Sequence, residues 1–345
     1  MTREQFRPPD HEADHFLLTT VVGSYPQPAW LDAARDLVEE GDLSADDLDE
    51  AEDDAVRAIS GDMVRAGLDV VTDGEQRRTG MVEYFAQFID GYDASGEGDD
   101  WNARMPTVVD TVSSDVPWLV DDFAFVSAVA DRPVKTTITG PFTLASFCSM
   151  EAYDGDVEQL AYDMADLVAA EAGRLADAGA KWIQIDEPAL GMSPHGGIAT
   201  ECLSRIAPEV PDDVRLGVHV CSGEYENLVP DLFEFPVDEI DLEFASQGAN
   251  DPHDLFGGVD LDVDVGYGVV DTQNKAAESV DEIVERIEYG LAVVPPERMT
   301  VVTDCGMKPL TRAPAEEKIT NLAAAARRVE RRLDDGELEA VASAN

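Results

Sequence analysis

The sequence predicts an α/β fold, specifically a (β/α)8 barrel, and three observations favour this class. Eight short β-rich runs alternate with helical patterns along the 345 residues, which indicates parallel strands joined by crossover helices. The glycine fingerprint of an open dinucleotide-binding sheet is absent, because the run GVDLDVDVGYG does not open a helix. Polar residues also gather where the runs end, at the face where such barrels carry their active sites.

Each predicted strand is a short apolar run, often β-branched, that ends in glycine or polar residues. The first run is TTVVGSY and the second is DVVTDGE. In chain order, the eight predicted strands are 19–25, 69–75, 135–141, 182–188, 215–223, 239–246, 262–271 and 299–306. Their regular alternation with helical segments is the basis of the barrel prediction.

Helical periodicity fills most of the intervals between these runs. The expected helices are 29–40, 46–66, a segment near 81–92, 156–179 and 314–333. Residues 93–134, between the second and third strands, are less regular and contain Gly, Asp and Pro. We expect this segment to be an insertion containing a hairpin. Since no internal repeat or low-complexity linker is present, we expect one catalytic domain over 1–345 with an N-terminal extension.

The charge of the chain excludes two classes of partner. Acidic residues number 73 against 24 basic ones, giving a net charge of −49. This field repels phosphate backbones and anionic membrane surfaces, so we expect no nucleic acid and no membrane partner. Acidic residues are spread through segments with apolar periodicity, which argues against a disordered tail. We interpret the charge as adaptation to a salty, haloarchaeal cytoplasm; the alternative is an acidic protein from an ordinary cell.

A cytoplasmic location agrees with the rest of the composition. No run of about 18 apolar residues is present, and the first 16 residues lack the apolar segment of a secretory signal. Four cysteines are too few for a disulfide scaffold in a chain of this length. In a reducing cytosol they serve as core residues, metal ligands or nucleophiles. Cys148 and Cys202 lie on predicted helices, and we interpret them as core residues.

Functional side chains cluster at the carboxyl ends of the predicted strands, which a barrel brings to one face. They are Gly23, Ser24, Asp73, Glu75, Asp186, Glu187, His219, Cys221, Glu243, Asp271, Asp304 and Cys305. For Asp186 and Glu187 the alternative is a cap or an ion pair at the strand end. His195 follows the fourth strand in a glycine-rich loop and is expected to be exposed to solvent rather than catalytic.

Four of these side chains form a candidate metal site: His219, Cys221, Glu243 and Cys305. Residues two apart on a strand face the same way, so His219 and Cys221 point inward together. One imidazole, two thiolates and a carboxylate suit Zn²⁺, and the sulfur ligands argue against Mg²⁺ and Ca²⁺. The alternative is that both cysteines are core residues and His219 is a strand histidine with a satisfied ring. Spacing alone does not separate these two interpretations.

A series of motifs, in order and covering most of the chain, resembles one known family. The motifs are TTVVGSYPQ, DGEQRRTGMVEYFAQFIDGY, TGPFTL, IQIDEPAL, HVCSGEYENL, DLEFAS and TDCGMKP. They are similar to the catalytic barrel of the cobalamin-independent methionine synthase family, in its short, single-barrel archaeal form. The resemblance implies a (β/α)8 barrel with Zn²⁺ on the four residues of the candidate metal site.

The resemblance also implies which residues hold the amino acid substrate. Homocysteine or methionine would contact Gly23, Ser24, Glu75 and Asp186, with Glu75 and Asp186 as the catalytic carboxylates. The chemistry agrees, because two carboxylates can hold an α-ammonium group and backbone N–H groups near Ser24 can hold an α-carboxylate.

The sequence departs from the family on the side of the methyl donor. Met192 stands where the family has a folate-side acid, Phe147 where it has Trp, and Gln273 where it has a proton-donating His. The second, N-terminal barrel of the longer members is missing as well. The donor is therefore expected to be a methylated folate, a methyl-pterin or a methylated corrinoid protein, and a second barrel subunit is a possible partner.

The resemblance implies methyl transfer to the thiol of homocysteine, giving methionine. Two alternatives stay open. One is another zinc-dependent alkyl transfer to a thiol, of the coenzyme M type; Glu75 and Asp186 argue against it, because coenzyme M has no ammonium group. The other is a non-catalytic barrel subunit of a two-subunit methionine synthase, against which the full set of four metal ligands argues.

Overall fold

The computed structural model describes residues 3–93, 105–193, 195–246 and 250–341. Seven strands form one sheet in the order β1-β10-β9-β8-β7-β6-β4. The bounds of the seven are Leu18–Thr19 (β1), Met299–Thr303 (β10), Asp264–Val270 (β9), Glu239–Leu242 (β8), Arg215–Val220 (β7), Trp182–Asp186 (β6) and Lys135–Thr139 (β4). The pairs β1–β10, β10–β9 and β6–β7 are parallel.

An eighth segment links the two ends of this order. The backbone N–H groups of Asp69 and Val70 donate to Thr19 O at 3.1 and 3.2 Å. Val71 then forms an isolated parallel bridge with Val134, and Lys135 N at the start of β4 donates to Val71 O at 2.9 Å. The hydrogen bonds therefore run from β1 through residues 69–71 to β4, as eight parallel strands of a barrel require. The predicted (β/α)8 class is confirmed.

The described residues divide into two compact units. The first comprises residues 78–121 and 137–240, and the second comprises 2–77, 122–136 and 241–345, apart from the gaps given above. The expectation of a single catalytic domain over 1–345 stays a prediction.

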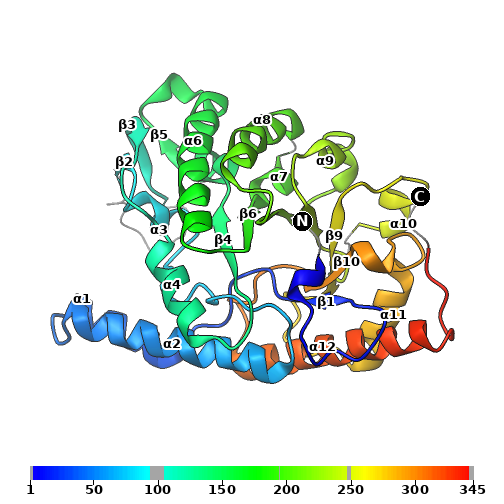
Figure 1. The fold of residues 1–345 in the computed structure, drawn as a ribbon. Coiled ribbons are helices and arrows are strands. Elements are labelled where there is room, and N and C mark those ends of the chain that lie inside the picture. Colours follow the sequence, from blue (N-terminus) through cyan, green and yellow to red (C-terminus); the bar gives the residue numbers. More distant parts are fainter. Residues whose placement is uncertain (1–2, 94–104, 194, 247–249, 342–345) are drawn as a thin grey trace. The chain divides into compact units, whose positions relative to one another are not determined.

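In the first unit, helices pack on each other and on a small second sheet. The helices are α3 (Glu83–Ala86), α5 (Pro141–Ser146), α6 (Val157–Asp177), α7 (Pro188–Met192), α8 (Gly196–Ile206) and α9 (Asp231–Glu234). The long helix α6 packs against α5. It also lies beside α8 (Figure 1). The second sheet has the order β2-β3-β5, with β2 at Asp90–Asp93, β3 at Thr107–Ser113 and β5 at Ser149–Met150.

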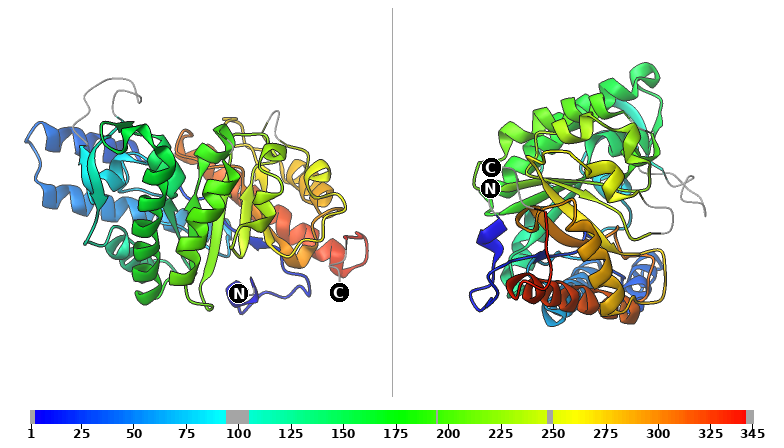
Figure 2. Two further views of the ribbon diagram at one scale, coloured as in Figure 1. Left: turned by 90° about the horizontal axis from the view of Figure 1, so that it is seen from above. Right: turned by 90° about the vertical axis from the view of Figure 1, so that its right-hand side faces the viewer.

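In the second unit, six helices of the described residues pack around the strands. They are α1 (Ala29–Glu39), α2 (Ala45–Ala66), α4 (Val120–Val129), α10 (Pro252–Phe256), α11 (Val280–Gly290) and α12 (Arg312–Asp334). A capping box begins α2 at Ser44 and Asp47, and Gly67 ends this helix with a φ of +89°. A second capping box, Ser279 with Glu282, begins α11. Helix α12 packs against α2 and α11 (Figure 2).

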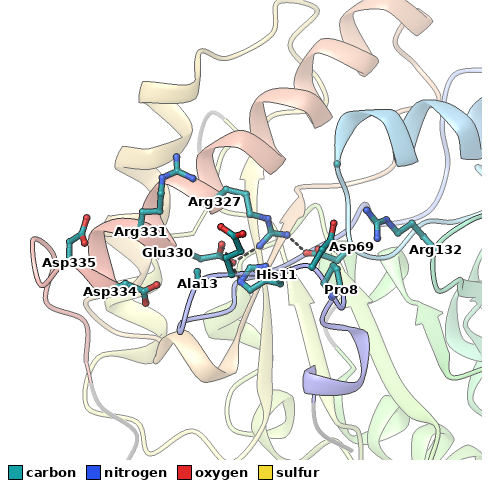
Figure 3. A pocket seen from close by; sticks show the side chains of 13 residues that line it. Pro8, His11, Ala13, Asp69, Arg132, Arg327, Glu330, Arg331, Asp334 and Asp335 are labelled. Atoms are coloured by element: carbon teal, nitrogen blue, oxygen red, sulfur yellow. Dashed lines mark hydrogen bonds and ion pairs between the residues drawn. The ribbon is translucent and has the colours of Figure 1, made fainter.

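Buried charged side chains hold the N-terminal extension in place within the second unit. It begins with a 3-10 helix, Arg3–Phe6, and Arg3 donates to Phe16 O at 2.8 Å. Arg327 of α12 donates to two buried carboxylates, Asp69 and Glu330, and lies between them (Figure 3). These residues line a cavity of about 540 Å³. Glu330 also accepts from Leu17 N at 2.7 Å, which fixes the entry to β1.

Several predicted boundaries are wrong. Strand 19–25 extends only over Leu18–Thr19, and 69–75 contributes a bridge rather than a full strand, because residues 23–25 and 74 hydrogen-bond to one another and to other loops. The helix near 81–92 contains only Glu83–Ala86 before β2 begins. Gly91 has a φ of +91°, and a β-carbon there would lie 2.7 Å from Thr111 O. Glycine at this position therefore lets the backbone of β2 approach β3, with which it pairs.

The other boundaries agree more closely with the prediction. The hairpin predicted within 93–134 is only partly correct: β3 lies in this range, but its antiparallel partner β2 begins at Asp90, and residues 94–104 lie outside the described residues. Cys148 follows α5 and is not on a helix, whereas Cys202 is on α8. No helix among the described residues is long and apolar enough to cross a membrane.

Candidate active site and metal centre

Asp186 and His219 are neighbours at the carboxyl ends of β6 and β7. The two residues pair in register, and Glu187 N donates to His219 O at 2.8 Å. Both side chains are buried. Gln184, two residues before Asp186 on the same strand, donates from Nε2 to Asp186 Oδ1 at 2.7 Å. The strand register therefore sets a carboxylate beside an imidazole, and Gln184 orients the carboxylate.

Cys221 directly follows β7 and is buried, in a position set by a close backbone approach. A β-carbon on Gly191, at the end of α7, would lie 1.9 Å from Cys221 O, so only glycine fits there. Ser222 has a φ of +64°, which turns the chain away just after the cysteine. The same turn brings Gly223 against Gly191.

Glu187 has a structural role next to Asp186. Its carboxylate accepts from Phe142 N at 2.9 Å and from Thr143 N and Oγ1 at 2.8 and 2.7 Å, and so caps α5. Burial raises the pKa of Glu187 to about 7, while the Thr143 hydroxyl and these backbone N–H groups lower it. The alternative given above for Asp186 and Glu187, a cap at the strand end, therefore holds for Glu187.

In the second unit, the predicted substrate residues lie on two loops that bond to each other. Thr72 Oγ1 donates to Gly23 O at 2.8 Å, and Tyr25 N donates to Gly74 O at 3.0 Å. Glu75 is half-buried and has a φ of +55°, and its N–H donates to Asp73 Oδ1 at 3.0 Å. The loops that carry Gly23, Ser24 and Glu75 are thus brought together.

The loop after β10 packs onto the same group. Met307 N donates to Ser24 O at 2.8 Å, and a β-carbon on Gly306 would lie 2.1 Å from Ser24 Oγ. Cys305, the residue before Gly306, is therefore held close to the Ser24 loop. The sequence analysis did not predict a role for Gly306, although its position in the TDCG motif, directly after Cys305, could have indicated one.

Asp304 is buried between two loops of the second unit. Its carboxylate accepts from Phe244 N at 3.2 Å, from Ala245 N at 3.0 Å, and from Ser246 N and Oγ. Burial raises the pKa of Asp304 to about 7; the Ser246 hydroxyl and the backbone N–H groups lower it, and the Glu243 charge raises it. Glu243 itself is buried at the end of β8.

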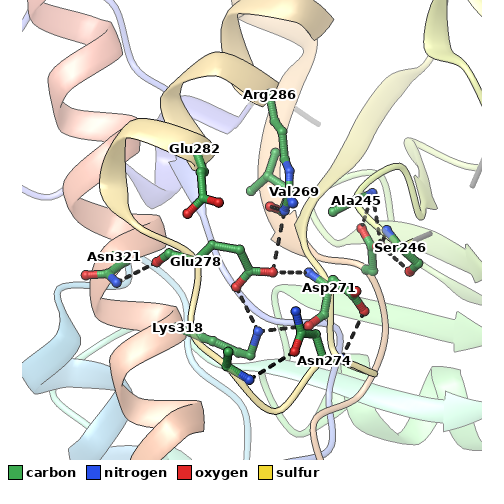
Figure 4. Close-up of polar contacts among 12 residues, drawn as sticks. Ala245, Ser246, Val269, Asp271, Asn274, Glu278, Glu282, Arg286, Lys318 and Asn321 are labelled. Carbon is green, nitrogen blue, oxygen red and sulfur yellow. Dashed lines mark hydrogen bonds and ion pairs between the residues drawn. The ribbon is translucent and has the colours of Figure 1, made fainter.

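The loop after β9 is fixed by a buried ion pair. Lys318 of α12 donates to Glu278 at 2.7 Å and to Asp271 O at 2.9 Å, and Glu278 accepts from Asp271 N at 2.8 Å (Figure 4). Gln273, within this loop, is exposed, and its N–H donates to Asp271 Oδ1 at 2.9 Å. Gln273, which the resemblance places at the family's proton-donor position, is therefore on an anchored loop.

Among the described residues, three of the four predicted ligands, His219, Cys221 and Cys305, form a group able to hold a metal ion, and the Glu243 carboxylate is not part of this group. One donor atom from each lies within 4.8 Å of the others. Two donors bound tetrahedrally to Zn²⁺ at about 2.0–2.3 Å are about 3.3–3.8 Å apart, so this spacing fits. Two sulfurs and one imidazole nitrogen are the donors that Zn²⁺ prefers. The interpretation of all three as core residues accounts less well for their convergence.

His195, Cys202 and Cys148 have no part in this group; His195 and Cys202 behave as predicted, whereas Cys148 is not a fully buried core residue on a helix. His195 is exposed and lies at the start of α8, with its ring 5.4 Å from that of Phe142. Cys202 is buried and donates to Ala161 O. Cys148 is half-buried, and burial raises the pKa of its thiol to about 11. A thiol with so high a pKa is a poor nucleophile near neutral pH.

The structure is a (β/α)8 barrel with one histidine and two cysteines grouped after its strands. Residues 17–328 match the family described as "Cobalamin-independent synthase, Catalytic domain". The chain belongs to this family, the cobalamin-independent methionine synthases, and is a methyltransferase of that type.

Individual relatives agree with this assignment. The chain is 39% identical over 311 residues to a methionine synthase of Sulfurisphaera tokodaii, covering 89% of this chain and 90% of the relative. A methionine synthase of Saccharolobus solfataricus is 38% identical, with 89% and 92% covered. A B12-independent methionine synthase from Shewanella sp. W3-18-1, solved with selenomethionine, superposes with a TM-score of 0.81 at 26% identity, covering 92% and 98% of the two chains.

Proposed function

We propose that this enzyme transfers a methyl group to the thiol of L-homocysteine and forms L-methionine, with Zn²⁺ held by His219, Cys221, Glu243 and Cys305. The observation that carries the proposal is the convergence of His219, Cys221 and Cys305 within 4.8 Å in a chain of this family. Glu243, buried at the end of β8, is the proposed fourth ligand and the one that gives way to the substrate sulfur.

The reaction forms a sulfur–methyl bond, breaks the bond from methyl to donor, and releases the thiol proton to solvent. A free thiol, with a pKa near 8.5, is mostly protonated at neutral pH. A bound zinc ion would ionise the thiol and keep the sulfur nucleophilic. Asp186 and Glu75 hold the α-ammonium group, and Gln184 orients Asp186 by the 2.7 Å hydrogen bond. Backbone N–H groups near Ser24 hold the α-carboxylate.

The proposed methyl donor is a methylated folate, a methyl-pterin or a methylated corrinoid protein. Gln273 and Met192, at two donor-side positions, are both exposed. An acceptor without an ammonium group, as in coenzyme M-type alkyl transfer, leaves Glu75 and Asp186 without a role, so homocysteine is the preferred acceptor. A second barrel subunit stays a prediction. The cytoplasm is the proposed location.

The test measures zinc content and homocysteine binding on purified protein in concentrated salt. We expect one zinc per chain and saturable homocysteine binding that depends on zinc. Cys221→Ala and Cys305→Ala should each lose most of the zinc, because each removes a thiolate ligand. Cys202→Ala is the matched control, since this buried cysteine is outside the metal group, and should keep zinc.

Two results would overturn the proposal: zinc-loaded protein that binds no homocysteine, or equal zinc content in all three cysteine variants. If homocysteine binds, a donor screen follows with methylcobalamin, methyl-tetrahydrofolate carrying one or several glutamates, and methyl-pterins. Methionine formed from one donor class identifies that class. Non-catalytic binding alone would favour the subunit alternative.

A further inference from the structure

The carboxylate of Asp304 connects two parts of the chain that each lie next to a proposed zinc ligand. It accepts hydrogen bonds from three consecutive backbone N–H groups, those of Phe244, Ala245 and Ser246, and from the Ser246 hydroxyl. Asp304 is fully buried. Several donors that converge on one buried carboxylate hold the donating loop in a single arrangement.

Asp304 reaches this loop by crossing β9, and the crossing depends on a glycine. Asp304 N donates to Val270 O at 3.0 Å, which ties its backbone to the end of β9. A β-carbon on Gly268 would lie 2.4 Å from Asp304 Oδ1 and 2.8 Å from Leu242 O. Only a residue without a side chain leaves room for the carboxylate to pass over β9 toward the loop after β8.

Each end of this connection, Asp304 and Phe244, is next to a proposed zinc ligand in the sequence. Cys305 follows Asp304, and Glu243 precedes Phe244. In the sheet order, β9 separates β10, which leads to Cys305, from β8, which leads to Glu243. No other strand pairing joins the ends of β8 and β10 directly, so the Asp304 carboxylate is a direct connection between the two ligand-bearing segments within the described residues.

We infer that Asp304 is a positioning residue which, with Gly268, sets the spacing of Glu243 and Cys305 before metal binds. This inference rests on the proposed zinc site and adds two residues to it that do not touch the metal. Partners of metal ligands typically alter metal affinity about 10–100-fold when they are changed. Because the connection joins the segments that carry Glu243 and Cys305, we expect its loss to change zinc affinity rather than folding alone.

The test compares variants by zinc affinity, measured by competition with a chromogenic chelator in concentrated salt. Asp304→Asn keeps the size of the side chain but turns an N–H₂ group toward backbone donors, and zinc affinity should fall about 10-fold or more. Gly268→Ala keeps every polar group and displaces the carboxylate, and should act in the same direction. Ser246→Ala removes one of the hydrogen bonds and should have a smaller effect.

Two control variants separate positioning from general damage. Glu171 is a fully buried carboxylate of α6 that accepts from Trp118 N and Leu119 N at 2.9 and 2.7 Å. Glu171→Gln should lower the melting temperature of the metal-free protein without changing zinc affinity. Gly197→Ala, where a β-carbon meets nothing within 4 Å, is the control for Gly268→Ala. Cobalt substitution supplies a second readout, because thiolate–cobalt absorption reports the ligand set directly.

The outcomes distinguish this inference from the proposed function. The inference is supported if the wild-type protein binds zinc and both Asp304→Asn and Gly268→Ala bind zinc more weakly. Wild-type affinity and an unchanged cobalt spectrum in both variants overturn the inference and leave the proposed function standing. Wild-type protein that binds no zinc overturns both. If Asp304→Asn fails to fold, Gly268→Ala and Ser246→Ala decide by the same measurement.

Discussion

Ser24 and Gly306 are in such close contact that a β-carbon on Gly306 would lie 2.1 Å from Ser24 Oγ. The contact is reinforced by the 2.8 Å hydrogen bond from Met307 N to Ser24 O. It places the residue after Cys305 against the loop proposed to hold the substrate carboxylate. Because Gly306 has no side chain, the loop that carries the proposed metal ligand Cys305 can pack directly on the Ser24 loop, which is proposed to bind the amino acid.

Gly306→Ala is expected to weaken homocysteine binding, because Ser24 must move to relieve the clash. Overpacking of this kind costs about 1–3 kcal/mol, and a cost of this size taken from binding corresponds to a loss of affinity of roughly 5- to 150-fold. Isothermal titration with homocysteine measures the effect. The double variant Ser24→Ala with Gly306→Ala removes the clashing hydroxyl and should recover much of the affinity. No loss in the single variant would contradict the proposed role of this contact.

Arg327→Ala is expected to destabilise the protein by about 3–5 kcal/mol, because it leaves Asp69 and Glu330 as buried, unbalanced carboxylates. Urea unfolding at constant high salt measures the free energy of unfolding. Arg328→Ala is the matched control on the same helix; its partner Asp281 is exposed, so a change of about 0–1 kcal/mol is expected. Equal effects of the two variants would refute a buried role for Arg327.

The stability of the protein should depend on pH through Glu330. Burial raises the pKa of Glu330, although Arg327, Leu17 N and His11 lower it, and Asp69 raises it further. Because the folded state binds this proton more tightly, its contribution to the free energy of unfolding is complete below the ordinary glutamate pKa of about 4.3. The contribution is lost as pH rises through the raised value.

Glu330→Gln removes this titration. The difference in unfolding free energy, wild type minus variant, should therefore decrease as pH rises across that window and then become constant. Urea titrations at a series of pH values and fixed high salt provide the measurement. A difference that increases with pH in the same window would show that ionised Glu330 is favoured in the folded protein.

Low salt should destabilise the enzyme, because a net charge of −49 repels itself when counterions are dilute. We expect the melting temperature to rise steadily from about 0.1 M KCl, where the Debye length is about 10 Å, to molar KCl. Neutral osmolytes at equal osmolality serve as the control. Full activity and an unchanged melting temperature near 0.1 M would rule out the interpretation as salt adaptation.

The strands were predictable because their apolar, β-branched runs are buried on both sides, as in β6 and β7, where every residue is buried. Their ends were not predictable. Residues 23–25 and 244–246 fall within the predicted strands, but their hydrogen bonds go to other loops. Such pairings depend on which loops meet in space, and a local pattern does not contain that information.

The candidate site also has a part that the sequence predicts and a part that it does not. The alternation of His219 and Cys221 on a strand predicts a shared direction, and their grouping with Cys305 agrees with it. The separate tasks of Asp186 and Glu187 were not predictable, since both are acids at one strand end. Adjacent residues on a strand face opposite ways, so one accepts from Gln184 and the other caps α5. The contacts of Gly191, Gly268 and Gly306 also require distant backbone to be in place.

The bond from Leu17 N to Glu330 joins residues 313 positions apart, and β1 finds its parallel partner in β10. Removal of α12 would therefore leave Leu17 N without its carboxylate acceptor and weaken the attachment of β1. A variant cut before residue 312 is expected to be degraded by proteases faster than the full chain, because the residues that hold its first strand come from its last helix.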